Sequence, residues 1–244
     1  MSKIVYRTLD VFEVFAQQKR PLSLTELVRQ LDIPVSSCHD VVRALEERGY
    51  LYEVRPRGGY YPTSRLFELS KIILDNDPVA DRAEPILRHL SDALNASVSL
   101  AKAKEMQLTY LMVLNPVDPL RFSVNAGDRA RNLYATSAGK ALLGSISLEE
   151  RRNYLKSIKL QPLTPHTLTD IPSLLADIEA SEQRGWFSNC EESVEDALTL
   201  SVRFIWSDVI YVITAAGTLN RMQRQLEQAS NLLMESAQQL QRST

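Results

Sequence analysis

One stretch decides the fold of the first part of the chain: Ser23-Leu-Thr-Glu-Leu-Val-Arg-Gln-Leu-Asp-Ile-Pro-Val-Ser-Ser-Cys-His-Asp-Val-Val-Arg-Ala-Leu-Glu-Glu-Arg-Gly-Tyr50. Ser23 precedes Glu26 by three residues, which is the spacing of a capping box, so a helix is expected to begin here. Pro34 disfavours helical geometry at the residue before it and favours the start of a second helix. Two short helices joined by a tight connector are typical of a helix-turn-helix.

A further helix precedes this motif, and a basic hairpin follows it. Apolar residues at helical spacing predict a first helix over about residues 6–17. Gly49 is expected to end the last helix of the motif, because glycine is common just past a helix C-terminus. Residues 50–54 and 59–62 flank a turn and predict a β-hairpin. Together these elements predict a winged helix-turn-helix over residues 1–62.

The helix expected over residues 35–48 has an apolar face and a polar face. Its expected buried positions are Val35, Cys38, Val41, Val42 and Leu45. In a helix-turn-helix, the second helix of the motif enters the major groove with its N-terminal half against base edges. Arg43 is suited to a guanine, and the arginines of the hairpin are suited to phosphates. The candidate DNA-binding residues are Thr25, Ser36, Ser37, His39, Asp40, Arg43, Arg55 and Arg57.

The alternative is that two amphipathic helices and a hairpin form only a small packing unit. The order of the elements, with each break where the motif needs one, favours DNA binding instead. The net charge of −2 argues against bulk attraction to nucleic acid, but residues 1–62 hold nine Lys or Arg and eight Asp or Glu. This slight positive excess has the sign expected of a local DNA footprint.

Length and composition set the remaining bounds. A chain of 244 residues with 44% hydrophobic residues can bury a real core, and the pattern favours two domains. No apolar run is long enough for a membrane span and no signal peptide precedes the motif, so a cytoplasmic protein with no membrane partner is expected. Cys38 and Cys190 are too few for a disulfide framework and lack zinc-site spacing, so reduced thiols, no metal and no cofactor are expected.

Residues 63–77 predict a linker helix with more apolar surface than a free linker needs. It is suited to pack against a second copy of the chain, in keeping with the two-fold symmetry of operator DNA, or equally to pack onto its own chain. Residues 78–244 predict an α+β domain with a central antiparallel sheet and helices on its faces. The elements expected there are helices over residues 80–94, 136–144 and 173–184, strands over 97–102, 108–114 and 208–216, further strands between, and one long final helix from Met222 to Leu240.

Three blocks of sequence carry a family resemblance. They are the helix-turn-helix with Leu-Ser-Leu-Thr-Glu-Leu, Ile-Pro-Val-Ser-Ser and Leu-Glu-Glu-Arg-Gly-Tyr; Ala135-Thr-Ser-Ala-Gly-Lys-Ala-Leu-Leu-Gly144; and Arg184-Gly-Trp with Glu191-Glu192, downstream of Leu168-Thr-Asp. With these blocks, the chain from about Thr8 to Leu240 resembles the IclR family of bacterial transcription regulators. The resemblance implies a GAF-like second domain that binds a small organic effector, and a dimer or tetramer whose affinity for its operator changes on binding.

The resemblance also implies an effector pocket around the Ala-Gly-Lys block, the segment after the Gly-aromatic pair, and the last strand. The matching positions are Ser137, Ala138, Asn189, Thr199, Thr214 and Ala216, and we add Tyr134 as a flat apolar wall. From the residues themselves, Ser137 and the backbone amides at a helix start are suited to a carboxylate. A plain N-cap is the alternative for Ser137.

The sequence departs from the family pattern at three points. Asp40 stands where the family commonly has Arg, and a carboxylate there repels phosphate but is able to accept from a cytosine amine. Residues 197–202 lack the usual Gly and Pro landmarks, and Asn189 stands where an acid is frequent. The departures at Asn189 and residues 197–202 point to an effector that is unusual for the family.

Catalytic chemistry has little support in the sequence. Ser137-Ala-Gly-Lys140 differs from a phosphate-binding loop because Tyr134 and Ala141 stand where Gly and Ser or Thr are required. The three histidines are not arranged in a hydrolase or metalloenzyme motif, so no catalytic residue is expected. The expected function is an effector-responsive DNA-binding regulator that senses a carboxylate or aromatic metabolite. The alternative is a small-molecule-binding or catalytic domain whose N-terminal unit only dimerises.

Overall fold

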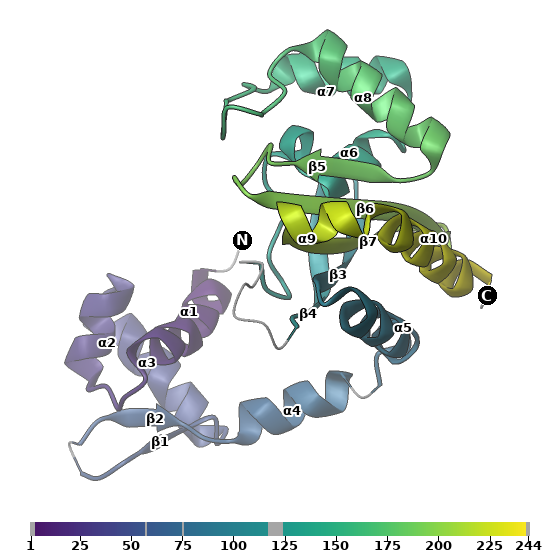
Figure 1. Cartoon of the computed structure of the whole chain (residues 1–244). Helices are drawn as coiled ribbons and strands as arrows, with labels where there is room; N and C mark the ends of the chain where they lie inside the picture. The colour runs from purple at the N-terminus through teal and green to yellow at the C-terminus, as the bar shows by residue number, and fades with distance from the viewer. Residues whose placement is uncertain (1–2, 57, 75, 117–123, 243–244) are drawn as a thin grey trace. The chain divides into compact units, whose positions relative to one another are not determined.

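A computed structural model of the chain describes residues 3–56, 58–74, 76–116 and 124–242. The chain forms two compact units, Met1–Asp77 and Pro78–Thr244, whose elements are labelled in Figure 1. The elements of the first unit, in chain order, are α1 (Lys3–Gln18), α2 (Leu24–Leu31), α3 (Val35–Glu47), β1 (Leu51–Glu53), β2 (Tyr60–Pro62) and α4 (Arg65–Leu74). The helix-turn-helix and the antiparallel hairpin predicted from the sequence are therefore present.

Local interactions fix the ends of these elements. At the start of α2, the Ser23 backbone N–H donates to Glu26 Oε2 at 2.8 Å, and the Glu26 N–H donates to Ser23 Oγ at 3.3 Å. The predicted capping box is thus confirmed. Gly49, just past the end of α3, has a φ of +73°, a left-handed conformation that favours glycine. Buried side chains of α1, α2, α3 and β1 form one core, including Val11, Phe15, Leu27, Val42 and Leu51.

One expectation for this unit differs from the structure, and another concerns a residue that the structure does not describe. Val35 was expected in the core, but it is 61% exposed. It is the first residue of α3, and the buried face of that helix begins one turn later, at Cys38. Arg57, a predicted phosphate contact, lies outside the described residues, whereas Arg55 is described and exposed.

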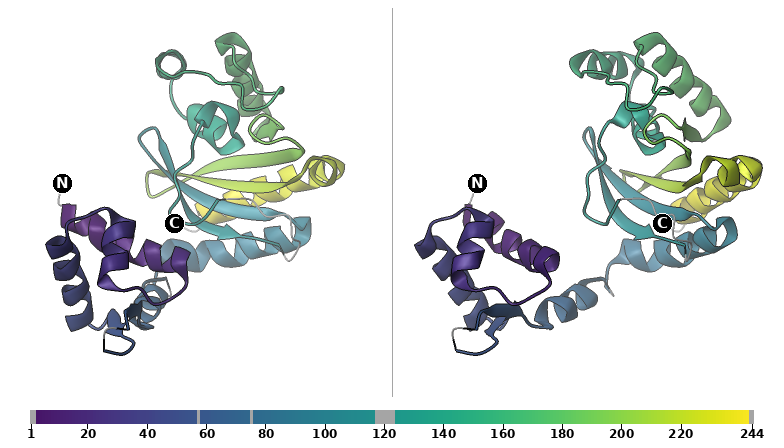
Figure 2. Two further views of the ribbon diagram at one scale, coloured as in Figure 1. Left: turned by 90° about the vertical axis from the view of Figure 1, so that its left-hand side faces the viewer. Right: turned by 60° about the vertical axis from the view of Figure 1, so that its left-hand side comes forward.

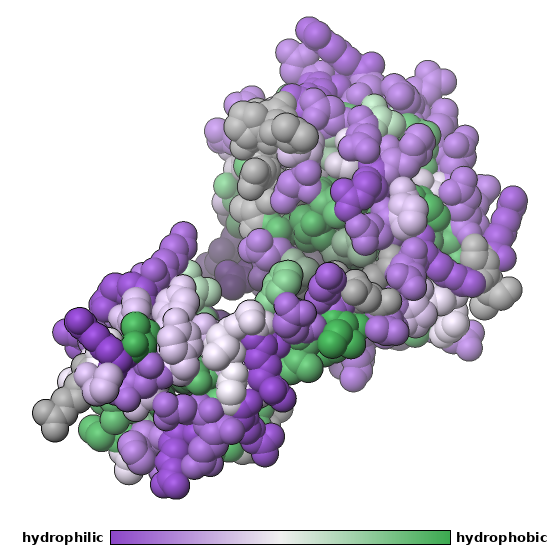
Figure 3. Space-filling model, turned by 90° about the horizontal axis from the view of Figure 1, so that it is seen from below, coloured by the Kyte–Doolittle hydropathy of each residue, from purple (hydrophilic) through white to green (hydrophobic). Residues whose placement is uncertain are grey.

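The linker helix α4 has an exposed apolar face. Thr63 Oγ1 accepts from the Arg65 N–H at 3.2 Å and donates to the Gly49 carbonyl at 2.6 Å, which ties the start of α4 to the end of α3. Beyond this start, Phe67 is 66% exposed and Ile73 is 71% exposed. Figure 3 shows apolar side chains, in green, reaching the surface among polar ones. Water is a poor environment for such side chains.

The second unit is built around a sheet. Its elements, in chain order, are α5 (Pro78–Leu94), β3 (Ser97–Lys104), β4 (Gln107–Leu114), η1 (Leu133–Ala135), α6 (Ser137–Leu143), α7 (Leu148–Ser157), α8 (Ile171–Arg184), β5 (Phe187–Cys190), β6 (Ala197–Trp206), β7 (Val209–Thr218), α9 (Leu219–Arg224) and α10 (Leu226–Arg242). Within the described residues, the strands form a five-stranded sheet in the order β4-β3-β7-β6-β5. All neighbouring strands are antiparallel, so the predicted α+β class is confirmed.

Helices cover both faces of this sheet, as Figure 2 shows. Alternate residues of each strand point to opposite faces. On one face, Leu100 and Ile213 pack with α5 and α10. On the other face, Ala101 and Val212 pack with η1, α6, α7 and α8. The second face also carries the polar residues of the candidate effector site.

The C-terminal helix differs from its expectation. One long helix was expected from Met222 to Leu240, but the chain forms α9 and α10 with a break at Gln225. Gln225 leaves helical geometry, and its side-chain Nε2 donates to the Leu94 carbonyl at 2.9 Å. Its own carbonyl accepts from the Ala229 N–H at 2.8 Å, which begins α10. A tertiary contact with α5 therefore accompanies a break that the apolar pattern alone does not contain.

Candidate functional site

The polar face of α3 is open to solvent. Ser36, His39, Asp40 and Arg43 are exposed, and Ser37 is half-buried. These residues lie opposite Cys38 and Val42, which are buried in the core of the unit. Thr25 near the start of α2 is also exposed. The predicted DNA-binding residues that the structure describes are thus all at least partly accessible.

Three of these side chains have partners within α3. Arg43 Nε lies 2.8 Å from Glu47 Oε1, one helical turn later, and both side chains are more than half exposed. His39 Nδ1 lies 3.7 Å from Asp40 Oδ1. Exposed pairs of this kind contribute little, typically about 0.2–1 kcal/mol, because water screens them. Arg43 is therefore held only weakly and is able to turn toward a base.

The candidate effector site contains a chain of hydroxyl groups. Ser137 Oγ lies 2.6 Å from Thr199 Oγ1 and 2.8 Å from Ser201 Oγ. Ser201 Oγ in turn lies 2.8 Å from Thr214 Oγ1. These residues come from α6, β6 and β7, and none is more than 6% exposed. We call Ser137, Thr199, Ser201 and Thr214 the hydroxyl cluster.

The register of the sheet explains this convergence. Thr199 pairs with Asn189 on β5 and with Ala216 on β7, and Ser201 pairs with Thr214. All five residues lie on the sheet face that α6 covers. Three of the predicted effector residues, Ser137, Thr199 and Thr214, are therefore joined. Ser201 was missing from the prediction, although its place two residues after Thr199 puts both on one face of a strand.

The other predicted effector residues have different surroundings. The Tyr134 hydroxyl donates to the Gln161 carbonyl at 2.9 Å and accepts from the Gln161 N–H at 3.0 Å. Asn189 Oδ1 accepts from the Glu192 N–H at 2.8 Å, and its Nδ2 lies 2.6 Å from Ser193 Oγ. Both polar groups are thus used within the chain. Ala138 is buried among apolar side chains of the same core.

The start of α6 is capped by Thr136, because Thr136 Oγ1 accepts from the Gly139 N–H at 3.1 Å. The alternative of Ser137 as a plain N-cap is therefore wrong. Ser137 is the first residue of α6, and its hydroxyl contacts the sheet. A Cβ on Gly139 would lie 2.2 Å from the Leu133 carbonyl oxygen, so only glycine allows α6 to pack this closely against η1.

A buried lysine holds the middle of α6. Lys140 is fully buried, and its Nζ lies 2.5 Å from Glu192 Oε1 and 2.7 Å from Asp177 Oδ2. Burial raises the pKa of Glu192, and Lys140 opposes that shift. Lys140 is thus the cation that the two acids share. Such a group is stable only while all its partners remain together.

Two arginines hold the C-terminal end of α6. Arg151 Nε donates to the Leu143 carbonyl at 2.9 Å, and Arg203 Nη1 donates to the Ala141 carbonyl at 3.3 Å. Glu182 on α8 accepts from both guanidinium groups, at 3.1 Å and 3.3 Å. Positive groups at a helix C-terminus satisfy free carbonyls and suit the helix dipole. Thus α6, which carries Ser137, is fixed along its length.

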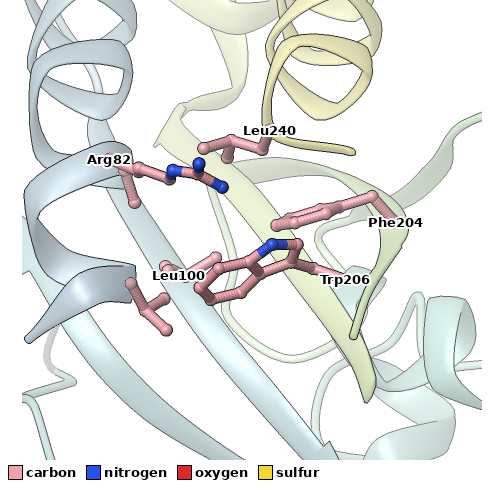
Figure 4. Close-up of a pocket in the computed structure, with 7 residues that line it drawn as sticks. Arg82, Leu100, Phe204, Trp206 and Leu240 are labelled. Carbon is pink, nitrogen blue, oxygen red and sulfur yellow. The ribbon is translucent and has the colours of Figure 1, made fainter. Parts of the chain in front are cut away.

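Two hollows in the second unit lie away from the hydroxyl cluster. Figure 4 shows a small cavity on the opposite sheet face, where the Arg82 guanidinium lies over the Trp206 ring at 5.6 Å, beside Phe204 and Leu240. Its volume of about 10 Å³ is enough for roughly one water molecule. The other is an open, polar groove near Asp196 and Arg224.

Among the residues that the structure describes, no group of three or more His, Cys, Asp and Glu side chains is arranged to hold a metal ion. In the same part of the chain, no helix has both the length and the apolar character needed to cross a membrane.

Comparison with known proteins gives matches along nearly the whole chain. Residues 72–242 match the family described as bacterial transcriptional regulator IclR C-terminal, and residues 5–55 match the IclR helix-turn-helix domain. The transcriptional repressor AllR of Escherichia coli is 28% identical over 214 residues, which cover 88% of this chain and 78% of AllR. The transcriptional regulator KipR of Bacillus subtilis is 28% identical over 186 residues, covering 76% of this chain and 73% of KipR.

Solved structures share the fold. The IclR protein of Thermotoga maritima matches with a TM-score of 0.81 and 21% identity, covering 98% of this chain and 97% of that chain. An IclR homolog of Microbacterium hydrocarbonoxydans, solved with 4-hydroxybenzoate, matches with a TM-score of 0.77 and 22% identity, covering 98% of both chains. At this level of identity the structures establish the arrangement of elements in each unit.

Proposed function

The chain belongs to the IclR family of bacterial transcriptional regulators, and on this premise we propose that it binds operator DNA as a homodimer or tetramer and senses a small organic effector in its second unit. The family consists of transcription regulators, so the chain is a regulator and not an enzyme. The observation that carries the proposal is the exposed polar face of α3, next to a hairpin, in a chain whose second unit holds a buried hydroxyl cluster. The domain limits that we propose are residues 1–62, 63–77 and 78–244.

DNA reading is assigned to α3 and the hairpin. Arg43 is long and exposed, and its partner Glu47 is easily released, so it suits a guanine in the major groove. Asp40, one turn earlier, is able to accept from a cytosine amine. Arg55 on the hairpin is exposed and suits a phosphate, as does Arg57 by its sequence. Base contacts then give specificity, and phosphate contacts give affinity.

Assembly is assigned to the apolar surfaces of the first unit. On α4, Phe67 and Ile73 are more than 60% exposed, and on α1, Ile4, Val5 and Leu9 are more than 50% exposed. A two-fold dimer buries the same surface of both copies, and it presents two reading helices to a palindromic operator. A second copy of this chain is therefore the partner that fits these surfaces.

The effector is assigned to the sheet face under α6. The hydroxyl cluster is buried and polar, and Ala138 and Ala216 are buried apolar residues in the same part of the domain. A few polar groups among apolar side chains are the composition typical of small-molecule sites. The complex of an IclR homolog with 4-hydroxybenzoate supports a carboxylate or aromatic metabolite as the class. Occupation of this site is proposed to change the affinity for the operator by linkage.

The first experiment measures fluorescence anisotropy of the full chain titrated onto DNA from upstream of its own coding region. Scrambled DNA is the control, and two salt concentrations are used. Tight, sequence-selective and salt-sensitive binding is expected for a regulator. Equal weak binding to all members of a genomic DNA pool would instead favour the alternative, in which the first unit only dimerises.

Two arginine variants separate base reading from phosphate contact. Arg43→Ala is expected to cost about 1–3 kcal/mol of operator binding and to relax sequence choice at one position. Arg55→Ala is expected to weaken all sequences alike and to reduce the salt dependence by about one phosphate contact. Selectivity that is unchanged in Arg43→Ala would remove α3 as the reader. The two variants are matched controls for each other.

Assembly is tested with Phe67→Asp in the full chain, by light scattering at the concentrations used for DNA binding. A charge in the apolar face of α4 is expected to shift the mass toward one copy and to weaken binding to two-half-site DNA more than tenfold. The matched control is Leu148→Asp, a similarly exposed leucine on α7, which is expected to leave the mass unchanged. An unchanged mass for Phe67→Asp would place the interface elsewhere.

A further inference from the structure

We propose that Ser201 is a positioning residue of the effector site: it joins the hydroxyl cluster into one hydrogen-bond relay with a single spare proton, so the relay offers the effector one donor. This inference rests on the proposed function, because it concerns the same site. Ser201 lies in the middle of the relay and is 0% exposed.

The connections define the relay. Thr199 contacts Ser137, Ser137 contacts Ser201, and Ser201 contacts Thr214, at oxygen separations of 2.6 to 2.8 Å. In each pair either oxygen is able to be the donor. The order along the relay is therefore Thr199, Ser137, Ser201, Thr214. Ser137 and Ser201 each have two neighbours, and the two threonines are the ends.

A count of protons gives the chemical consequence. Each hydroxyl carries one proton and has two acceptor lone pairs, so four hydroxyls with three links between them use three protons and leave one. An acceptor placed at Thr199 draws the spare proton there, and the three links then all run toward Thr199. An acceptor at Thr214 reverses the direction. The position of one acceptor atom on the ligand thus sets the direction of all three hydrogen bonds in the relay.

Ser201 is the link that makes this possible. Without its hydroxyl, Thr214 has no neighbour in the cluster, while Thr199 and Ser137 remain one linked pair. Each of the two fragments then has a spare proton, so the site offers two donors in place of one. Removing Ser201 therefore changes which ligands are satisfied, and it leaves Thr199 and Thr214 in place.

The surrounding charges narrow the ligand class. Lys140, Arg151 and Arg203, the cations that hold α6, are all engaged by carboxylates. A phosphate ester, with several charged oxygens, is best held by Arg and Lys groups, which are not free here. The relay supplies its one proton to a single acceptor oxygen, such as that of a carboxamide or one oxygen of a carboxylate. The second oxygen of a carboxylate receives no proton from the relay.

The first test needs no ligand. The equilibrium constant for unfolding of the second unit is measured in urea with full-length protein. The native chain is compared with Ser137→Ala, Thr214→Val and the double variant. Because these two residues interact through Ser201, the effect of one change is expected to differ by at least about twofold when the other is present. In a Ser201→Ala background this coupling is expected to disappear.

A control cycle pairs Ser91→Ala with Thr214→Val. Ser91 is a buried serine on α5 whose hydroxyl donates to the Ala96 carbonyl, outside the relay, so no coupling is expected. Circular dichroism of each variant establishes that it is folded before the cycle is read. Coupling that is absent in the native background, or that persists with Ser201→Ala, would overturn the relay.

The second test uses 4-hydroxybenzamide and 4-hydroxybenzoate as probes, titrated by calorimetry. The two probes share a phenol hydroxyl and differ in their other group. The carboxamide group has one acceptor oxygen and an N–H donor, whereas the carboxylate group has two acceptor oxygens. Ser201→Ala is expected to shift the affinity ratio toward the carboxylate by roughly threefold or more, since a second donor becomes free. Ser91→Ala is expected to leave the ratio unchanged.

The two tests separate the two ideas. An unchanged ratio in Ser201→Ala overturns the positioning role of Ser201 while leaving the effector site standing. If neither probe binds the native chain, the assignment of an aromatic effector to this site fails, and with it the role of the relay in effector choice. Neither result bears on operator binding. The anisotropy experiment tests that part of the proposed function separately.

Discussion

The reading helix and the hydroxyl cluster are built in opposite ways. The residues that shape the helix-turn-helix interact with near neighbours in the sequence, as Ser23 does with Glu26 and Arg43 with Glu47. The residues of the hydroxyl cluster come from distant segments, and Ser137 and Thr199 are 62 positions apart. The first site is exposed and the second is buried.

This contrast has an energetic side. Exposed, local interactions are worth about 1 kcal/mol or less, because water competes for the same groups. Buried polar groups lack that competition, so losing one partner is expensive. In the proposed function, small changes therefore adjust the DNA-binding face, whereas the effector site depends on the packing of the whole domain. The three predictions below test this contrast, from the largest effect to the smallest.

The largest effect is expected at Lys140. Lys140→Met removes the cation between Asp177 and Glu192 and leaves a buried and a partly buried carboxyl group without it. The second unit is expected to lose about 3–5 kcal/mol of stability, measured by urea unfolding at neutral pH. Lys159→Met, a change at an exposed lysine, is the matched control and is expected to cost almost nothing. Equal stability of the two variants would contradict the structural role of Lys140.

The same variant has a defined pH dependence. Burial already raises the pKa of Glu192, and loss of Lys140 is expected to raise it further. Between the ordinary pKa of a carboxyl group and the raised pKa of Glu192, the folded state binds a proton that the unfolded state does not. Stability therefore falls as the pH rises through this range. The deficit of Lys140→Met is therefore expected to shrink as the pH is lowered toward the ordinary pKa of a carboxyl group. A deficit that grew on acidification would have the wrong sign.

An intermediate effect is expected at the start of α2. Ser23→Ala removes one half of the capping box and is expected to cost about 1 kcal/mol, measured by thermal unfolding of the first unit. The backbone N–H of Ser23, with help from the Arg20 side chain, lowers the pKa of Glu26 to about 2. A lowered folded pKa adds stability above the ordinary carboxyl range and loses it as the pH falls from there to about 2.

Glu26→Gln is the matched control for that pH dependence. Glu26→Gln is expected to remove the part of the stability loss at low pH that is due to Glu26. Ser23→Ala is expected to make that part of the loss smaller. If the stability of the first unit falls equally with decreasing pH in the native chain and in Glu26→Gln, the capping box does not lower the pKa of Glu26.

The smallest effect is expected at Glu47. Glu47→Gln removes the exposed pair with Arg43 and is expected to change stability by about 0.5 kcal/mol or less. Because Arg43 is then free, operator affinity measured by anisotropy is expected to rise about twofold, a factor set by the strength of such pairs. Glu46→Gln, at the neighbouring exposed acid, controls for the loss of negative charge alone. Equal gains for the two variants would show that charge, and not release of Arg43, is responsible.

Much of the fold was predictable because its signals are local. Ser23 and Glu26 predict the start of α2, and Gly49 predicts the end of α3. The helix expected over 80–94 and the strands expected over 97–102 and 108–114 correspond to α5, β3 and β4. Helix α7 was not expected, because only Arg151 and Leu155 are buried on it and its apolar periodicity is weak. The exposed position of Val35 and the break at Gln225 depend on packing that the pattern does not record.

The candidate effector site shows where local signals stop. Resemblance to the family predicted Ser137, Thr199 and Thr214, which the structure joins, but it missed Ser201 between them. The resemblance also predicted Asn189, and we added Tyr134 to it. The polar groups of both side chains are bonded within the chain. A polar residue in a strand reveals its face through alternation, but its partner depends on which strand and helix lie beside it.

By itself, the sequence determined where α2 begins, where α3 ends and which face of α3 is polar, because caps, glycines and periodicity act over a few residues. Only the tertiary structure decided that Lys140 is buried between two acids and that Ser201 connects Ser137 to Thr214. Those contacts join segments tens of residues apart, and their strength comes from the exclusion of water. Burial of that kind exists only after the sheet and helices have packed.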